Sequence, residues 1–141
     1  MNEKKYPSVI ISGLGISGLI TASLLCKEKV KVECFEPVDI SKFHEDQRTT
    51  AFLNPAIEVF KEIGVWEQIE PFSQPLKEME IIDAGSQKKI GLAGVVFKPK
   101  EVNIDNFGYN VPNNLLRLEL LGLLKKNQNF VLNIGESVTK H

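Results

Sequence analysis

Apolar and polar residues change their spacing along the N-terminal part of the chain, and this change predicts a βαβ unit. Residues 8–12 are a β-branched run that stops at Gly13, which is typical of a short buried strand in a parallel sheet. Residues 16–28 carry apolar side chains at helical spacing, and residues 30–35 alternate like a strand that must end before Pro37. The order strand, glycine turn, helix, strand predicts an α/β fold, a Rossmann-like domain with a parallel sheet.

The pattern of the remaining residues predicts two more helices and three more strands. Residues 37–53 are polar and irregular. A helix begins at Asn54, which would act as its N-terminal cap before a proline, and ends at Gly64. A leucine-rich helix capped by Asn113 or Asn114 follows later in the chain. Strands are predicted over residues 77–83, 90–97 and 129–134.

Length and composition indicate one soluble globular domain that spans residues 1–141. The chain is long enough to bury a core and is 43% hydrophobic and 25% charged. Its 17 basic and 18 acidic residues nearly cancel, so no general field would attract nucleic acid. The two cysteines, Cys26 and Cys34, lack the spacing of a metal or redox motif. We expect both to be small buried residues in a reducing compartment, and we expect no metal site.

The apolar N-terminal segment also admits a signal peptide or a membrane anchor, because Lys4 and Lys5 precede it. Three glycines and several hydroxyl side chains make residues 8–25 only weakly hydrophobic for a membrane span. The segment also lacks a small-residue cleavage site. We therefore expect neither a signal peptide nor a transmembrane segment, and we predict a cytoplasmic protein that can work at the inner face of the membrane.

Three glycines between the first strand and the first helix predict a dinucleotide site. Gly13, Gly15 and Gly18 form the pattern G-x-G-x-x-G in its proper context, after a strand and before a helix. Gly13 permits a tight turn, Gly15 lets a diphosphate approach the backbone, and Gly18 lets the helix lie close to the sheet. Free N–H groups of the first helical turn would face the phosphates. Glu36, at the end of the next strand, would accept hydrogen bonds from an adenosine ribose. The motif leaves NAD, FAD and a turn without a ligand as alternatives.

Four stretches of the sequence resemble one family, and they occur in the family's order. They are SGLGISGLITASLL, DQRTTAFLNPAIEVFKEIG, WEQIEPFSQPLKEMEIIDA and FGYNVPNNLLRLELLGLL. The chain resembles the N-terminal part of the FAD-dependent aromatic-ring monooxygenases of ubiquinone biosynthesis, which belong to the para-hydroxybenzoate hydroxylase superfamily. The resemblance implies a flavoprotein oxidoreductase that hydroxylates a polyprenyl phenol with NAD(P)H and O2. The D-x-R-T-T stretch argues against the alternative of an NAD-binding dehydrogenase domain.

The resemblance also implies roles for particular residues. The glycine loop would hold the FAD diphosphate, and Glu36 would hold the adenosine ribose. Arg48 of the D-x-R-T-T stretch would reach the flavin nucleotide, and Arg117 would contact the diphosphate side. Val138 would meet the adenine through its backbone. The rival interpretations are a surface ion pair for Arg48 and a solvated helix edge for Arg117. The cofactor residues implied are Gly13, Leu14, Gly15, Ile16, Ser17, Gly18, Glu36, Arg48, Arg117 and Val138.

Two departures from the family pattern affect the fold and the function. Family members carry a glycine where the first helix turns into the second strand, and this chain has Lys29 there. We expect a shifted turn, because a left-handed lysine is strained. The Asp-Gly and Gly-Asp motifs and the substrate region of the family are also absent by residue 141. The chain is therefore expected to be incomplete relative to the full-length family and weakly active or inactive alone.

These expectations leave the catalytic residues unknown. Residues 77–110 would begin a substrate-domain hairpin within the FAD-binding domain. The expected partners are FAD, the phenol substrate, and either a complementing C-terminal polypeptide or other ubiquinone-biosynthesis proteins. A non-catalytic truncated remnant or nucleotide-binding module is the alternative. His44 and His141 are expected at the surface, and Trp66 is expected in core or interface packing.

Overall fold

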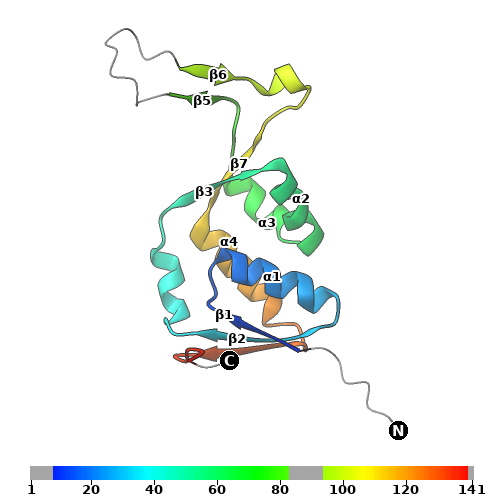
Figure 1. Ribbon diagram of the computed structural model, residues 1–141, viewed down its shortest axis with the longest axis vertical. Helices are drawn as coiled ribbons and strands as arrows, with labels where there is room; N and C mark the ends of the chain where they lie inside the picture. The colour runs from blue at the N-terminus through cyan, green and yellow to red at the C-terminus, as the bar shows by residue number, and fades with distance from the viewer. Residues whose placement is uncertain (1–7, 83–93, 140–141) are drawn as a thin grey trace.

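The computed structural model, which describes residues 8–82 and 94–139, confirms an α/β fold built on a parallel sheet. The sheet contains β1 (Ser8–Ser12), β2 (Lys31–Glu36) and β8 (Phe130–Ile134), with β2 in the centre. It forms the lowest layer of the molecule in Figure 1. All three strands were predicted, and their parallel order follows from the helical connections between them.

Two helices cover one face of this sheet. α1 (Ile16–Lys27) joins β1 to β2, and α4 (Asn113–Leu124) leads into β8. The two helices pack against each other above the sheet (Figure 1). The other face stays open within the described residues, and Ile10 is 62% exposed there. The prediction of a strand at residues 8–12 is confirmed, but its predicted burial is wrong, because within the described residues helices cover only one face of the strand.

An antiparallel sheet lies above the helices and links them to the upper part of the molecule. It contains β3 (Thr49–Leu53), β7 (Gly108–Pro112) and β4 (Gln74–Pro75), in the order β3-β7-β4. The prediction that residues 37–53 are irregular is wrong for β3. A short 3-10 helix, η1 (Ile40–Glu45), precedes that strand. β3 pairs with β7 through Thr50 and Val111, which lie far apart in the sequence.

The helices α2 (Asn54–Ile63) and α3 (Trp66–Ile69) follow β3, and a 3-10 turn, η2 (Glu70–Phe72), follows α3. α2 has the predicted extent and ends at Gly64 in a left-handed conformation. Its predicted cap is wrong, because Leu53 occupies the cap position. The side-chain amide nitrogen of Asn54 instead donates to the backbone oxygen of Asn106 at 2.7 Å. This bond ties the start of α2 to the segment before β7.

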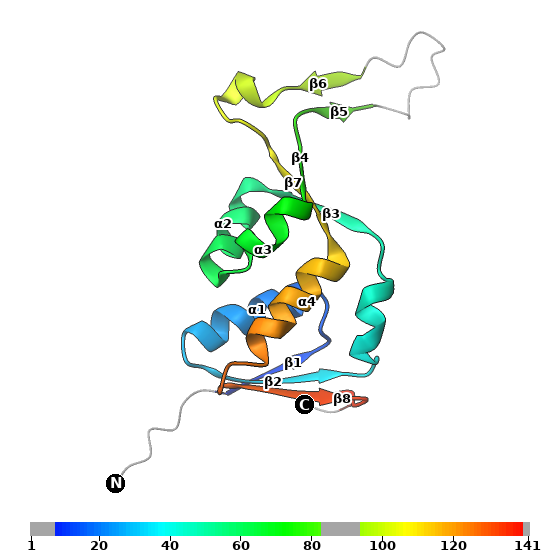
Figure 2. The ribbon, with the colours of Figure 1, turned by 180° about the vertical axis from the view of Figure 1, so that it is seen from behind.

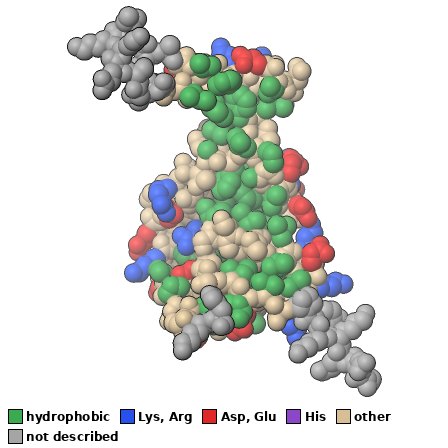
Figure 3. All heavy atoms as spheres, in the orientation of Figure 1, with side chains coloured by type: hydrophobic (Ala, Val, Ile, Leu, Met, Phe, Trp, Pro, Cys, Tyr) green, Lys and Arg blue, Asp and Glu red, His purple; other side chains and the backbone are tan. Residues whose placement is uncertain are grey.

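A β-hairpin projects from the body of the molecule (Figures 1 and 2). Its strands are β5 (Met79–Ile81) and β6 (Val95–Phe97), and η3 (Pro99–Val102) follows them. Both predicted strands are present, but residues 77–78, 82 and 94 of the predicted ranges are not in a strand, and residues 83 and 90–93 lie outside the described residues. All six strand residues of the hairpin are exposed. Hydrophobic side chains cover the hairpin and continue down the face shown in Figure 3.

One hydrophobic core joins the parallel sheet to the helices. Cys26 and Cys34 are buried free cysteines within it, as predicted. Trp66 is buried and meets Tyr109 edge to face at 4.9 Å, which confirms its packing role. The described part of the chain contains no helix whose length and hydropathy would let it cross a membrane. The buried core residues are Leu14, Leu19, Ala22, Cys26, Val32, Cys34, Phe43, Ile57, Phe60, Val65, Trp66, Ile69, Val111, Leu116, Leu120, Leu121 and Leu124.

The turn between α1 and β2 keeps a left-handed residue although that residue is a lysine. Lys29 has φ of 61°. Its N–H donates to the oxygen of Cys26 at 3.1 Å, and the N–H of Val30 donates to that of Leu25 at 3.0 Å. These two bonds form a Schellman motif, which requires a left-handed residue after the helix cap. The expected shift of this turn is therefore wrong, and the fold is intact.

Candidate functional site

The glycine turn, Glu36 and the segment after β8 meet at the carboxyl edge of the parallel sheet. The N–H of Gly13 donates to the oxygen of Phe35 at 2.8 Å. The N–H of Gly135 donates to the oxygen of Glu36, also at 2.8 Å. Three separate parts of the sequence are thus fixed side by side. The carboxyl ends of parallel strands are the usual place for ligand sites in open α/β sheets.

Two of the three glycines have the mechanical roles that the sequence predicted. Gly13 has φ of 93°, so it makes the turn that a residue with a side chain would resist. A β carbon on Gly18 would overlap the carbonyl oxygen of Gly13, so this glycine permits the close contact of α1 with the turn. Gly15 has an ordinary φ of −63°, and, as at Gly13, no described atom beyond its chain neighbours would lie within 4 Å of a β carbon there. The backbone at Gly15 therefore borders open space that can admit a ligand.

The N-terminus of α1 is suited to an anion. Gly15 occupies the cap position, and Ile16, Ser17 and Gly18 form the first turn. Among the described residues, no side chain caps these N–H groups, and the first turn contains no acid. The exposed N–H groups and the helix dipole therefore favour negative charge at this point. The buried Leu14 anchors the loop in the core beneath.

Glu36 is a buried carboxylate that holds the glycine turn. It is 6% exposed, and its Oε2 accepts from the N–H of Leu14 at 2.6 Å. Its Oε1 accepts from the N–H of Val38 at 3.0 Å. A carboxylate can accept about four hydrogen bonds in total, so each oxygen retains a lone pair for a further donor. Glu36 can therefore hold the loop and still accept from a ribose hydroxyl.

Arg117 reaches from α4 to the glycine turn. Its guanidinium lies over the ring of Phe43 at 3.6 Å, and one nitrogen donates to the oxygen of Leu14 at 3.4 Å. The side chain is only 19% exposed, and its Nε has no partner among the described residues. The interpretation of Arg117 as a solvated helix edge is therefore wrong. The structure brings this residue together with the glycine turn.

Arg48 lies at the same side of the molecule but points to solvent. Its side chain is 81% exposed and forms a bidentate ion pair with Asp46. The Nε of Arg48 donates to Oδ1 at 2.7 Å, and a terminal nitrogen donates to Oδ2 at 2.9 Å. Hydrogen bonds from Arg48 hold the pKa of Asp46 well below its usual range. The surface ion pair that the sequence offered as a rival interpretation is thus present. The pair leaves the other N–H groups of Arg48 free for a ligand.

The last predicted residue, Val138, follows β8 and is half-buried. It lies three positions after Gly135, whose N–H is bonded to Glu36. The structure therefore places Gly135 beside Glu36, whose side chain holds the glycine turn. His44 is exposed as predicted, and His141 lies outside the described residues.

Sequence reasoning missed two residues that shape this site. Phe43 of η1 is buried and supports the guanidinium of Arg117. Asp46 contacts Arg48 and also lies 4.0 Å from a terminal nitrogen of Arg117. The only signal of Asp46 in the sequence was its position two residues before Arg48. A separate hollow of about 820 Å³ between α2, α3 and β7 contains none of the predicted cofactor residues.

The chain is similar in sequence to a known monooxygenase. The chain is 26% identical over 149 aligned positions to the ubiquinone biosynthesis monooxygenase COQ6, mitochondrial, of Dictyostelium discoideum. The match covers 90% of this chain and 28% of that protein. No family model matches the chain. The chain therefore spans little more than a quarter of the curated relative's length.

Solved structures of monooxygenases share the fold. PqsL, a probable FAD-dependent monooxygenase from Pseudomonas aeruginosa, superposes with a TM-score of 0.69 at 20% identity, covering 97% of this chain and 36% of that one. The p-nitrophenol 4-monooxygenase PnpA from Pseudomonas putida DLL-E4 superposes with a TM-score of 0.67 at 16% identity, covering 96% and 33%. The chain thus resembles the FAD-dependent monooxygenases in sequence and has the fold of about one third of such a protein.

Proposed function

We propose that the chain is the FAD-binding part of a flavin monooxygenase that hydroxylates a polyprenyl phenol in ubiquinone biosynthesis. The observation that carries the proposal is the open glycine turn beside Glu36, at the end of a parallel sheet. The curated relative, a ubiquinone biosynthesis monooxygenase, supports the substrate class. The polyprenyl substrate would be dissolved in a membrane, so we propose a cytoplasmic protein that acts at the membrane surface.

The residues of the site fit the adenosine diphosphate half of FAD. The open space over Gly15 and the acid-free first turn of α1 would receive the diphosphate. Arg48 and Arg117 would supply the guanidinium groups that suit a diphosphate, and Glu36 would accept from the ribose. The backbone near Val138 would contact the adenine. Bound FAD would supply the redox chemistry of the hydroxylation with NAD(P)H and O2, and the protein would position the cofactor and exclude water.

We also propose that the β5–β6 hairpin belongs to a substrate-binding region, attached to a single FAD-binding domain. The exposed side chains of Ile81, Val95 and Phe97 support this, because apolar residues clustered on a projecting hairpin indicate a surface that another element covers. A complementing polypeptide, or another protein of ubiquinone biosynthesis, would supply that element. The catalytic competence of the chain would then depend on this partner.

Equilibrium titration of the purified chain with FAD tests the proposal, with flavin fluorescence as the readout. We expect saturable binding and a yellow protein after removal of free flavin. A colourless protein that takes up no FAD would support a non-catalytic remnant. Tight binding of NAD without affinity for FAD would instead support a dehydrogenase domain.

A pair of glycine variants tests whether FAD binds at the glycine turn. Gly15 has φ of −63°, so Gly15→Ala fits the backbone and adds a methyl group only to the open space. We expect at least tenfold weaker FAD binding with an unchanged melting temperature. Gly122→Ala is the matched control, because Gly122 lies in α4 and a β carbon there also meets open space. An unchanged affinity of the Gly15→Ala variant for FAD would contradict a site at this turn.

A further inference from the structure

The two arginines assigned to the diphosphate are joined by one carboxylate. Asp46 is only 11% exposed, although Arg48 beside it is 81% exposed. Its Oδ1 accepts from the backbone N–H of Arg48 at 3.2 Å and from Nε at 2.7 Å, and its Oδ2 accepts from a terminal nitrogen at 2.9 Å. Oδ2 also lies 4.0 Å from a terminal nitrogen of Arg117. One side chain thus contacts both guanidinium groups.

Further contacts fix Asp46 to α4. The amide of Asn113 lies 3.5 Å from Oδ2, and Asn113 is itself buried. The oxygen of that amide accepts from the hydroxyl of Thr50 at 2.7 Å, and the N–H of Asn113 donates to the oxygen of Arg48 at 3.0 Å. Asp46 is therefore held between the end of η1, the start of β3 and the start of α4. Such a carboxylate has little freedom to move.

We propose that Asp46 is a positioning residue that orients Arg48 and Arg117 for the diphosphate, an inference that rests on the proposed FAD site. Arg48 uses one edge of its guanidinium for Asp46, which leaves its remaining N–H groups for a second anion. Arg117 is fixed between Asp46, the ring of Phe43 and the oxygen of Leu14. The energetic benefit of this arrangement is preorganisation, because two long side chains need not be ordered on binding.

A positioning role for Asp46 predicts that loss of its charge weakens diphosphate binding, whereas simple electrostatics predicts that binding becomes stronger. A carboxylate near a diphosphate repels it, so removal of the charge alone would strengthen binding. If Asp46 positions the arginines, Asp46→Asn instead weakens binding. Asp46→Glu keeps the charge but displaces the carboxylate by one methylene group, so it also weakens binding. Glu45→Gln is the matched control, because Glu45 is an exposed neighbour and its loss changes the net charge equally.

The experiment compares the affinities of the full chain and its variants for FAD, ADP and adenosine. We expect about tenfold weaker binding of FAD and ADP by Asp46→Asn and Asp46→Glu, with adenosine binding unchanged because it lacks phosphates. Glu45→Gln should bind ADP as tightly as the wild type or more tightly. Adenosine affinity and the melting temperature report whether each variant is folded.

The outcomes separate the two proposals. A wild type that binds FAD, together with Asp46 variants that bind ADP equally or more tightly, overturns the positioning role alone. Equal weakening of adenosine and ADP assigns Asp46 to the stability of the fold and also overturns it. A wild type that binds neither FAD nor ADP overturns the proposed function and the positioning role together.

Discussion

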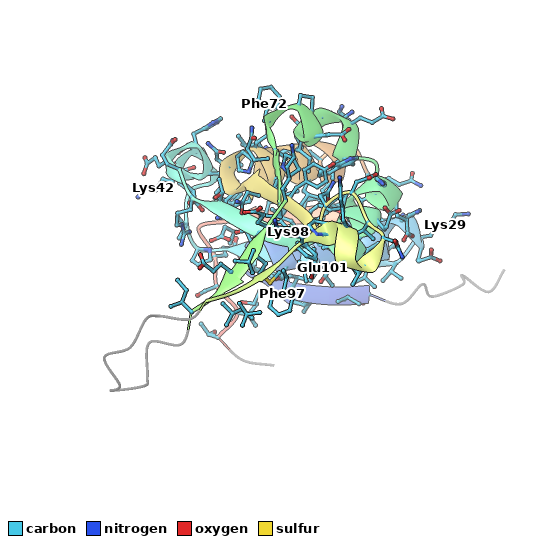
Figure 4. The ribbon with its side chains drawn as sticks, turned by 90° about the horizontal axis from the view of Figure 1, so that it is seen from above. Lys29, Lys42, Phe72, Phe97, Lys98 and Glu101 are labelled. Atoms are coloured by element: carbon cyan, nitrogen blue, oxygen red, sulfur yellow. The ribbon has the colours of Figure 1, made fainter. Side chains whose placement is uncertain are left out.

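Lys29 shows that a single residue can adopt an unfavourable conformation when the surrounding backbone requires it. Its φ of 61° lies in the left-handed region, where a residue with a side chain is strained by about 1 kcal/mol. The two hydrogen bonds that close α1 depend on this conformation. The side chain itself lies at the edge of the molecule, as Figure 4 shows.

Lys29→Gly should therefore raise the free energy of unfolding by about 1 kcal/mol, measured by urea denaturation. Lys29→Ala is the control, because it removes the charge and keeps the β carbon, and it should leave stability nearly unchanged. FAD affinity should be the same in both variants, since the turn lies at the opposite end of β2 from Glu36. Equal stability of the glycine and alanine variants would show that the lysine is not strained.

The buried thiol of Cys34 should make the protein less stable at alkaline pH. Burial, with a smaller effect of Cys26, raises the pKa of the Cys34 thiol from its usual value of 9.0 to about 11. The native thiol then keeps its proton at pH values where the unfolded thiol has lost it. Stability should therefore fall as the pH rises from about 9 towards 11, by at most about 1.4 kcal/mol per unit.

Urea denaturation of the wild type and of Cys34→Val between about pH 8 and pH 10 measures this effect. The variant should lose less stability over this interval, because the thiol that titrates is gone. Parallel curves would mean that other groups cause the alkaline loss. Below about pH 8 the two proteins should show the same pH dependence.

At the scale of elements, the molecule divides into a packed body and an exposed hairpin. Leu120 of α4 is fully buried, whereas Ile81 of β5 is 58% exposed. Leu120→Ala should cost about 2–5 kcal/mol of unfolding free energy, and Ile81→Ala should cost less than about 0.5 kcal/mol. Urea denaturation of both variants checks this contrast. A comparable loss for the two would show that the hairpin stabilises the body.

Elements with regular apolar spacing were predictable from the sequence, and strands among polar or turn-forming residues were not. α1, α2 and α4 have helical spacing with glycine or proline at their ends. β3 is as long as the predicted β1 and β8, but it was missed because it directly follows a polar segment. β7 was missed because it begins with Gly108 and ends with Pro112, residues that usually indicate turns.

Some features of the candidate site could likewise be predicted from the sequence, and others could not. The roles of Gly13 and Gly18 followed from their spacing, because a strand, a turn and a helix are local structures. The contact of Asp46 with Arg117 could not be predicted, since it depends on how α4 packs against η1. The cap expected at Asn54 was wrong for a similar reason. Its side chain has a distant partner in the oxygen of Asn106.

At the scale of the whole molecule, the proposed cofactor should stabilise the fold. A ligand that binds only the folded state, at one hundred times its Kd, adds about 2.7 kcal/mol. FAD should therefore raise the melting temperature in a concentration-dependent way, measured by differential scanning calorimetry. Riboflavin lacks the adenosine diphosphate half and should have no such effect. An equal shift with riboflavin would place the binding energy outside the glycine turn.

The strand order also has a consequence for how the protein is made. β2 pairs on one side with β1, its neighbour in the chain, and on the other with β8, which is synthesised much later. The bond from Gly135 to Glu36 forms only after that. Pairing over so long a distance in sequence slows folding. Cofactor capture at the glycine turn is therefore expected only after β8 has been synthesised and has paired with β2.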